Sequence, residues 1–326
     1  MADPETPRSV TSSRVRIAVL TFQRPGDIAA ALPRLLEQAR GVTDALTTAD
    51  IVVVDNDPAG SARSAVTELA SSTPDVVIRY EHEPTPGIAA ARNRALDTAV
   101  DVDLLVFIDD DERPSPAWLS LLLRTYAEHR SAAVVGPVVS EFAEPPSSWI
   151  TAGRFFDRLR RPTGTPVGVA ATNNLLLDLH QIRPMGLRFD VAFGLSGGSD
   201  TLFTRELHRR GGRLIWCDEA VVSDVVPSSR ATRGWVLRRA LRSGNSWSRT
   251  SLELSDSAAR RTAVRLRLGG QGLLRLAGGG ARLVVGVLAR SQGQRARGLR
   301  TLARSAGMLS GACGYVYQEY RRRPQA

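Results

Sequence analysis

The fold is decided by one stretch of sequence, Leu104-Leu105-Val106-Phe107-Ile108-Asp109-Asp110-Asp111-Glu112. Its five apolar residues predict a strand that is buried on both faces, and four acids follow without a spacer. In an open α/β sheet, ligands bind beyond the carboxyl ends of the strands, so we expect these acids at a binding site. Because successive side chains of a strand alternate in direction, Asp109 and Asp111 are expected to share one side while Asp110 points away.

Two carboxylates on the same side of a strand end suit a hard divalent cation, Mg²⁺ or Mn²⁺, which takes oxygen ligands and keeps several waters. The alternative is a solvated acidic turn. The position directly after a buried strand favours the metal, so the predicted ligands are Asp111 and Asp109.

The segments on either side alternate between apolar runs and helical patterns, which predicts an α/β fold with a doubly wound, mostly parallel sheet. The predicted strands are 15–21, 50–55, 76–80, 103–108 and 133–139. The predicted helices between them are 27–40, 61–71, 88–98 and 116–130. After a Pro-rich break at 144–146 we expect strands at 168–177, 213–217 and 220–226, and a helix at 200–210.

These patterns divide the chain into three parts. Residues 1–14 lack periodicity and are rich in Pro, Ser and Thr, so we expect a disordered N-terminus there. Residues 15–230 form the predicted catalytic domain, with a first half at 15–140 and a second half at 141–230. Residues 231–326 form a basic helical region. The two cysteines and four histidines show no metal-ligand spacing.

The net charge of +10 is concentrated at one end of the chain. Residues 230–326 hold 20 Arg and three acids, so this end carries +17 and the remainder carries −7. A nucleic-acid partner is not expected, because the tail shows no interleaving of basic and aromatic residues. The charge points instead to an anionic membrane surface.

Apolar residues recur at helical spacing in the tail, at 273–276 and 283–288, and Gly278-Gly279-Gly280 separates the two runs. No run reaches the roughly 18 uncharged apolar residues that are needed to span a bilayer. A helix lying in the membrane interface fits the Leu, Val and Arg pattern. The alternative is a basic helical hairpin packed on the catalytic domain or on a second subunit, as in a homodimer.

Several segments resemble glycosyltransferase family 2, in the order that this family shows them. They are Val19-Leu20-Thr21-Phe22-Gln23-Arg24-Pro25, Val52-Val53-Val54-Asp55-Asn56, Pro86-Gly87-Ile88-Ala89-Ala90-Ala91-Arg92-Asn93-Arg94-Ala95 and the acid run Asp109-Asp110-Asp111. The resemblance covers about residues 15–230. It implies a GT-A fold, a nucleotide-diphosphate sugar donor, a metal bound by the acid run, and an inverting reaction.

The resemblance also assigns residues to the donor. The implied nucleotide-sugar-binding residues are Thr21, Phe22, Arg24, Asp55, Gly87, Arg92, Asn93, Asp109 and Asp110. A glycine lets backbone approach the diphosphate closely, and the helix that begins beside it directs N–H groups at phosphate. An arginine adds charge-assisted donors.

A later segment, Phe193-Gly194-Leu195-Ser196-Gly197-Gly198-Ser199-Asp200, resembles the family segment whose last acid is the general base. The matching residue is Asp200, and its alternative role is a first-turn acid of a helix. Many members have Glu where this chain has Ser199, which puts the acceptor type and the local electrostatics in question.

Further contacts are implied on the acceptor side of the cleft. Residues 221–230 resemble a late loop in exopolysaccharide-assembly transferases, which makes Asp224 a further metal candidate and Arg230 a phosphate contact. The remaining acceptor or phosphate candidates are Asn173, Asn174, Gly198 and Ser199. The alternative for the asparagines is to satisfy a strand end. Trp118 and Trp149 are candidates for stacking on sugar, although core packing is the simpler role.

The sequence therefore predicts an inverting glycosyltransferase that moves a sugar to a saccharide or lipid-linked acceptor. We expect it in the cytoplasm, peripheral at the inner face of the membrane. One alternative is a sugar-1-phosphate nucleotidyltransferase, although the chain has no Lys-bearing phosphate loop after the first strand. The other is a non-enzymatic basic module that binds membrane or nucleic acid, which leaves the acid-tipped strand unexplained.

Overall fold

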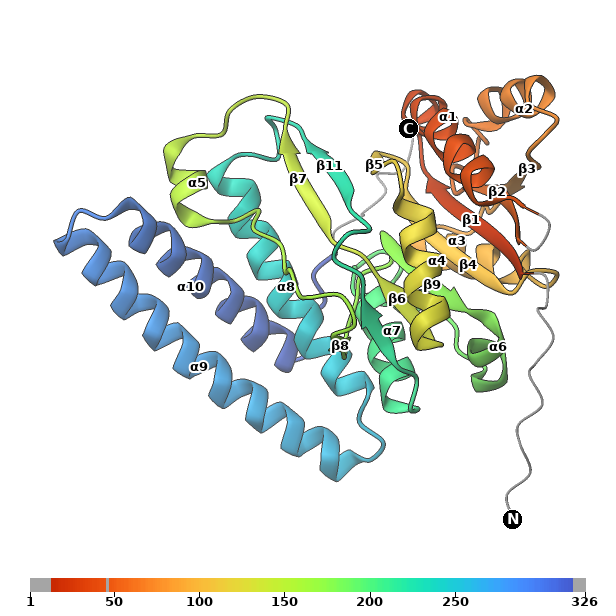
Figure 1. Ribbon diagram of the computed structural model, residues 1–326. Helices are drawn as coiled ribbons and strands as arrows, with labels where there is room; N and C mark the ends of the chain where they lie inside the picture. The colour runs from red at the N-terminus through yellow and green to blue at the C-terminus, as the bar shows by residue number, and fades with distance from the viewer. Residues whose placement is uncertain (1–12, 45–46, 319–326) are drawn as a thin grey trace, which may run out of the picture.

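The computed structural model describes residues 13–44 and 47–318 (Figure 1). Most of the predicted disordered N-terminus therefore lies outside the described residues, while Ser13 and Arg14 already belong to the first strand. The strands are β1 (Ser13–Thr21), β2 (Thr47–Asp55), β3 (Ile78–His82), β4 (Leu104–Asp109), β5 (Glu112–Pro114), β6 (Ala133–Val135), β7 (Val138–Phe142), β8 (Pro166–Val167), β9 (Asn174–Asp178), β10 (Leu214–Trp216) and β11 (Val222–Val226).

The helices confirm the predicted alternation, with ends shifted by one or two residues. They are α1 (Pro25–Val42), α2 (Arg63–Ser72), α3 (Ile88–Asp97), α4 (Trp118–His129), α5 (Ser148–Gly153), α6 (Leu179–Ile182), α7 (Ser199–Arg209), α8 (Arg233–Glu253), α9 (Ala258–Leu288) and α10 (Gln292–Ala312). The short helices α5 and α6 and the strand β5 were not predicted.

The large sheet has the strand order β3-β2-β1-β4-β9-β6-β10-β8. Strands β1 to β4 are parallel to one another, and β9 runs antiparallel to both of its neighbours. The prediction of a mostly parallel, doubly wound sheet is confirmed. Residues Ile17 and Val19 pack against α1 and α4 on one face, and the alternate residues Ala18 and Leu20 pack against α3 on the other.

The predicted strand at 133–139 is wrong in one respect, because it is two strands in two sheets. β6 belongs to the large sheet, whereas β7 pairs with β11 in a small sheet of order β5-β11-β7. Gly136 and Pro137 separate them, and proline cannot donate a ladder hydrogen bond. Of the predicted strand at 168–177, only the last part is a strand, β9. The preceding strand β8 ends at Val167, before the predicted strand begins. In the small sheet, β5, which follows the acid run, pairs with β11, which precedes the C-terminal helices.

The tail forms three helices beside the sheet domain, with α10 packed against α8, α9 and α5 (Figure 1). The glycines Gly278-Gly279-Gly280, which separate the two apolar runs of the tail, lie inside α9, and the helix continues through them. Glycine is a poor helix former in isolation, but here it permits close helix packing. A Cβ on Gly279 would lie 3.1 Å from the backbone nitrogen of Leu302, and one on Gly298 would lie 2.8 Å from that of Leu283.

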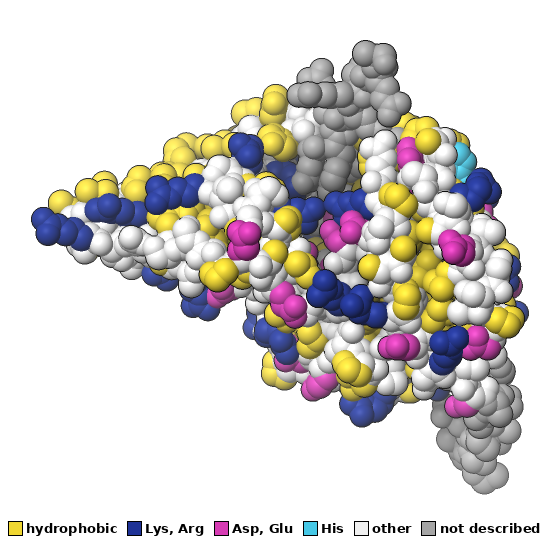
Figure 2. Space-filling view, turned by 90° about the horizontal axis from the view of Figure 1, so that it is seen from above, with side chains coloured by type: hydrophobic (Ala, Val, Ile, Leu, Met, Phe, Trp, Pro, Cys, Tyr) yellow, Lys and Arg dark blue, Asp and Glu magenta, His cyan; other side chains and the backbone are white. Residues whose placement is uncertain are grey.

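No helix within the described residues is long and apolar enough to cross a bilayer. The outer face of α9 nevertheless carries exposed apolar side chains, which we call the outer stripe: Leu266, Leu273, Leu274, Val284, Val285 and Leu288. Their spacings approximate whole helical turns, and the buried residues of α9 lie on its opposite face. Figure 2 shows apolar side chains along one edge of the projecting arm, with Arg side chains beside them.

Candidate active site

The acid run lies where β1 and β4, neighbours in the middle of the sheet, both end. The hydroxyl of Thr21, the last residue of β1, donates a 2.8 Å hydrogen bond to Asp110. Arg24, next to the start of α1, reaches the same turn and lies 3.1 Å from Asp110 and 2.9 Å from Asp111. These contacts bring together four of the predicted site residues.

The expected alternation of the three aspartates does not extend beyond Asp109, because Asp110 and Asp111 both contact Arg24. Strand β4 ends at Asp109, so the alternation of a strand does not extend to Asp110 and Asp111, which form a turn. Both turn residues reach the guanidinium of Arg24, and Arg230 approaches Asp111 at 3.8 Å. The late loop that carries Arg230 is therefore part of the site, although more than a hundred residues separate it from the acid run.

Glu112 is a site residue that the sequence analysis missed. Its buried carboxylate accepts hydrogen bonds from the backbone N–H of Asp109 at 3.1 Å and from Nδ2 of Asn173 at 2.6 Å. Burial and the nearby Asp109 raise its pKa well above the ordinary value. Glu112 closes the acid turn, and Asn173 holds Glu112. The run of four acids was a sequence signal that could have identified Glu112. The strand that begins at Glu112 has only three residues and leaves no recognisable pattern.

Negative charge is crowded at the end of β4. Burial raises the pKa of Asp109 to about 7, Arg92 opposes that rise, and Asp111, Asp110 and Asp200 add to it. Burial also raises the pKa of Asp110 to about 6, against the hydrogen bond from Thr21. Asp109 and Asp200 are therefore electrostatic neighbours, although 90 residues separate them in the sequence.

Asp200 lies in the first turn of α7, after the left-handed residue Gly198 with φ of +96°. Its Oδ1 accepts the backbone N–H of Thr201 at 2.7 Å. Its Oδ2 has no hydrogen bond within the described part of the chain. The carboxylate is thus fixed at the start of α7 through one oxygen. A Cβ on Gly198 would lie 3.2 Å from Cβ of Ser246 on α8, so this glycine serves helix packing.

Arg92 is buried behind this site. It donates a 2.8 Å hydrogen bond to the hydroxyl of Ser199, and its guanidinium lies over the ring of Phe189. Its Nε is buried without a hydrogen-bond partner in the described residues. Arg92 therefore supplies positive charge near Asp109 from behind and stays within the protein in this structure.

Two other residues implied to bind the donor hold loops together. Gly87 has φ of +119°, and a Cβ there would lie 3.2 Å from the backbone of Gly194, so the close approach is to protein. The amide of Asn93 exchanges two hydrogen bonds with the backbone of Phe189. Both contacts fix the segment that leads to Asp200.

Asp55 lies at the end of β2 and is fully buried. Its carboxylate accepts hydrogen bonds from the backbone of Asp57 and Ala62 and from the hydroxyl of Tyr80. These bonds shape the loop after β2, where a nucleotide contact was implied. Phe22, by contrast, is 36% exposed after β1, which leaves a ring surface accessible.

Four predicted candidates are engaged within the protein. Asn174 is buried, accepts a hydrogen bond from Trp118 and donates to the backbone of Pro137 and Ala220, so it joins strand ends as its alternative role required. Trp118 and Trp149 are also buried and pack in the protein core. Asp224 is paired with Arg158 at 3.4 Å.

Within residues 13–44 and 47–318, no three His, Cys, Asp or Glu side chains form a group that could hold a metal ion. The donor set at the acid turn nevertheless fits a divalent cation. Asp109 and Asp111 offer hard oxygen ligands, and the crowding that raises the pKa of Asp109 is charge that a cation would offset. A cation with two protein ligands would take its others from water and from phosphate.

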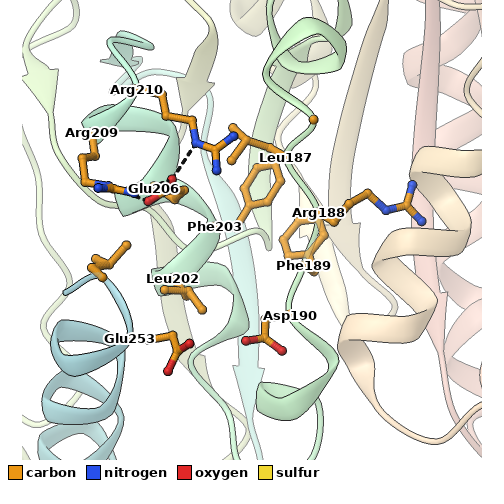
Figure 3. Close-up of a pocket in the computed structure, with 12 residues that line it drawn as sticks. Leu187, Arg188, Phe189, Asp190, Leu202, Phe203, Glu206, Arg209, Arg210 and Glu253 are labelled. Carbon is orange, nitrogen blue, oxygen red and sulfur yellow. Dashed lines mark hydrogen bonds and ion pairs between the residues drawn. The ribbon is translucent and has the colours of Figure 1, made fainter. Parts of the chain in front are cut away.

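A cavity of about 420 Å³ lies along α7, away from the acid turn. Figure 3 shows it between α7 and the segment that carries Leu187 and Phe189, with Asp190 and Glu253 at one end. None of the predicted site residues lines it. Its wall includes the stacked rings of Phe189 and Phe203 and the ion pairs of Glu206 with Arg209 and Arg210.

Comparison with known proteins gives the family. Residues 16–178 match the sequence model of Glycosyl transferase family 2. The chain is 35% identical over 239 residues to the succinoglycan biosynthesis protein ExoM of Rhizobium meliloti (strain 1021), an alignment that covers 73% of this chain and 75% of that protein. These matches span the strands that carry the acid turn.

Solved structures show the same fold at low identity. The mannosyltransferase PcManGT of Pyrobaculum calidifontis, in complex with GDP-Man and Mn²⁺, has a TM-score of 0.58 at 17% identity and covers 94% of this chain and 91% of its own. S. aureus TarS 1–349 in complex with UDP has a TM-score of 0.50 at 16% identity, covering 94% and 93%. The chain spans 42% of the longer TarS structure. The predicted GT-A fold is confirmed.

Proposed function

We propose that this chain, which belongs to glycosyltransferase family 2, transfers a sugar from a nucleoside diphosphate sugar to an acceptor hydroxyl with inversion at the anomeric carbon. Membership of the family makes it a glycosyltransferase. The donor class, the inversion and the residue roles are our proposal. Structures of the same fold that contain GDP-Man or UDP support the donor class.

The observation that carries the proposal is the electrostatic proximity of Asp109, at the end of β4, and Asp200, in the first turn of α7. Asp200 contributes to the raised pKa of Asp109, so the two carboxylates lie within electrostatic reach of each other. One belongs to the acid turn, which suits a metal and diphosphate. The other has a carboxylate oxygen without a hydrogen-bond partner among the residues that the structure describes. A donor and an acceptor bound between them would place the reacting hydroxyl beside that oxygen.

In the proposed reaction, Oδ2 of Asp200 accepts the proton of the acceptor hydroxyl as its oxygen attacks the anomeric carbon. The bond to the nucleoside diphosphate breaks on the opposite face, so a single displacement inverts the configuration. A divalent cation held by Asp109 and Asp111 would supply positive charge to the departing diphosphate. Arg24 and Arg230 both contact the acid turn and would add charge-assisted donors to the same phosphates.

The experiment that tests this function is a screen of nucleotide sugars for metal-dependent release of nucleoside diphosphate. With an active donor and a sugar acceptor, proton NMR then reads the anomeric configuration of the first product formed. We expect the opposite configuration to that of the donor, and retention would contradict the mechanism. Release of pyrophosphate from a sugar 1-phosphate and a nucleoside triphosphate would identify a nucleotidyltransferase instead.

We propose further that the outer stripe of α9 holds the protein at an anionic membrane, where a lipid-linked acceptor would be found. Leu274 and Leu288 are 76% and 79% exposed. Arg267, Arg275 and Arg282 interrupt the same helix, and α9 contains no acid. Apolar insertion and Arg contacts with anionic headgroups would act together, each Arg contributing about 1 kcal/mol. This location corresponds to the inner face of the cell membrane, with the catalytic domain in the cytoplasm.

A further inference from the structure

A second, smaller cavity of about 170 Å³ lies between the C-terminal helices and the loop after α5. It is outside the acid turn and shares no residue with the cavity in Figure 3. Figure 1 shows α5, α8 and α10 side by side at this place. Four arginines line the cavity, Arg158 from the loop, Arg239 from α8, and Arg300 and Arg304 from α10.

The positive charge in this cavity exceeds the negative charge that the described residues place beside it. Asp157 is its one acidic lining residue among those described, and it pairs with Arg154. Asp224 forms an ion pair with Arg158 and partly opposes the fall in the pKa of Arg239, while Nε of Arg158 is buried with no hydrogen-bond partner in the described residues. Burial lowers the pKa of Arg239 to about 10, and the neighbouring Arg158 adds to that effect.

Guanidinium groups bind phosphate through planar, paired donors, and several of them around a small cavity suit an anion that carries more than one charge. Crowded, partly buried arginines that outnumber their acidic partners are costly in isolation. A bound anion would offset this cost. The cavity is therefore arranged for a phosphate or diphosphate.

The cavity adjoins the proposed reaction centre through one side chain. Arg230 lies near enough to Arg239 to influence its pKa, and it also approaches Asp111 in the acid turn. The donor phosphates belong at the carboxyl ends of β1 and β4, whereas no residue of the large sheet lines this cavity. A phosphate held here would belong to the other substrate.

We propose that this cavity binds the phosphate or diphosphate group of the acceptor, which makes the acceptor a phosphorylated molecule that presents its hydroxyl to Asp200. This inference rests on the proposed function and specifies its acceptor class. Arg158 and Arg239 are the main contacts, while Arg300 and Arg304 complete the cavity from α10.

Isothermal titration of the full chain in EDTA, with inorganic pyrophosphate and separately with farnesyl diphosphate, tests the proposal. We expect Arg158→Gln/Arg239→Gln to weaken both ligands by about tenfold or more, as for the loss of hydrogen bonds to a charged group. Arg238→Gln is the matched control, because it removes the same charge from an exposed neighbour on α8 and should change affinity less than about twofold. Arg304→Gln, on the more exposed side, replaces the double variant if that variant does not fold.

The controls separate this site from the donor site and from a lipid headgroup site. Asp111→Ala should not weaken pyrophosphate binding in EDTA, and a loss there would assign the binding to the acid turn and overturn the proposal. Unchanged pyrophosphate affinity in the Arg variants would also overturn it. So would a loss of binding confined to phosphatidylglycerol vesicles, since that result identifies a headgroup site. Donor hydrolysis by the native protein is measured separately, so its absence would contradict the enzymatic function without affecting this binding result.

Discussion

Nη1 of Arg92 on α3 donates a 2.8 Å hydrogen bond to the hydroxyl of Ser199, the residue directly before Asp200. Ser199 is 1% exposed, so this contact is sealed from water. Where many family members have Glu, this chain has a neutral hydroxyl, which leaves the positive charge of Arg92 available to the carboxylate of Asp109. Arg92 partly opposes the rise in the pKa of Asp109 that burial causes.

Ser199→Ala should therefore affect both stability and catalysis. Loss of the hydroxyl leaves a buried guanidinium without its acceptor, and we expect the free energy of unfolding to fall by about 1–3 kcal/mol. Ser196→Ala is the matched control, since Ser196 is also buried and accepts a hydrogen bond from Arg249. Urea denaturation should show losses in both variants, while the turnover number should fall only in Ser199→Ala. Equal turnover in the two would show that Ser199 does not position Asp200.

Asp200→Asn should bind the donor normally and transfer sugar at least about a hundredfold more slowly, because it removes a general base without changing the shape of the side chain. Asp190→Asn is the control, since Asp190 caps a nearby turn through the N–H of Ala192 and Asn performs the same role. Donor affinity by calorimetry and turnover by product release are measured for both. Sugar transfer near the native rate in Asp200→Asn would contradict the role of general base. Asp200 would then have only a structural role, its hydrogen bond at the start of α7.

Asp111→Ala should abolish metal-dependent binding of the donor, because the diphosphate charge then lacks a carboxylate-held cation. Asp27→Ala is the control. It tests whether the loss of affinity comes only from removing an acidic partner of Arg24, since Asp27 also approaches Arg24 at 3.8 Å but lies outside the acid turn. Titration with a nucleoside diphosphate and Mn²⁺ should show lost affinity in Asp111→Ala and native affinity in Asp27→Ala. A folded Asp111→Ala variant with unchanged affinity would contradict the metal assignment.

The crowded acids predict how the stability of metal-free protein depends on pH. The pKa of Asp109 is about 7 in the folded protein, above its ordinary value of 3.8, so the folded state holds this proton more tightly than the unfolded chain. The free energy of unfolding should fall as the pH rises from about 4 to 7 and level off above that. Asp109→Asn should be more stable than the native protein at pH 8, with the advantage shrinking towards pH 4. A constant difference in urea denaturation across that range would contradict the expected ionisation.

The outer stripe can be tested by two substitutions on α9. Leu274→Ser/Leu288→Ser should weaken binding to phosphatidylglycerol vesicles by about tenfold or more, since burial of each leucine contributes about 1.5 kcal/mol or more. Val100→Ser is the control, because Val100 is 76% exposed on the catalytic domain. Flotation measures binding to the vesicles, and light scattering measures whether the protein is a monomer or a dimer. A native dimer that becomes monomeric in the double variant, with no vesicle binding in either, would assign the stripe to a second subunit.

The sequence predicts the central strands and their helices because their patterns are long and strongly apolar. Through the family resemblance it also assigns Asp109 and Asp200 to one site, and the structure brings them within electrostatic reach of each other. The directions of Asp110 and Asp111 were not predictable, because the end of β4 is set by the turn that Glu112 closes. The packing of Arg92 on Ser199 depends on tertiary contacts between segments 107 residues apart, which no local pattern encodes.

The sequence also makes no prediction that one helix, α9, runs through Gly278-Gly279-Gly280, and the reason is different. Single-sequence rules treat consecutive glycines as a break, because they weigh the intrinsic cost of each residue. Gly279 is instead buried against α10, so the tertiary contact outweighs the local preference. The same applies to Gly244 and Gly307, which bring the backbones of α8 and α10 together.

These glycine contacts also determine where inactivating mutations should arise. Every missense change of one nucleotide in a glycine codon introduces a residue with a Cβ. At Gly244 and Gly307 that atom would overlap the backbone of the opposite helix, which no rotamer change can relieve. The cavity arginines of α8 and α10 depend on this spacing. Random mutagenesis should therefore recover loss-of-function alleles in the tail, far from any catalytic carboxylate.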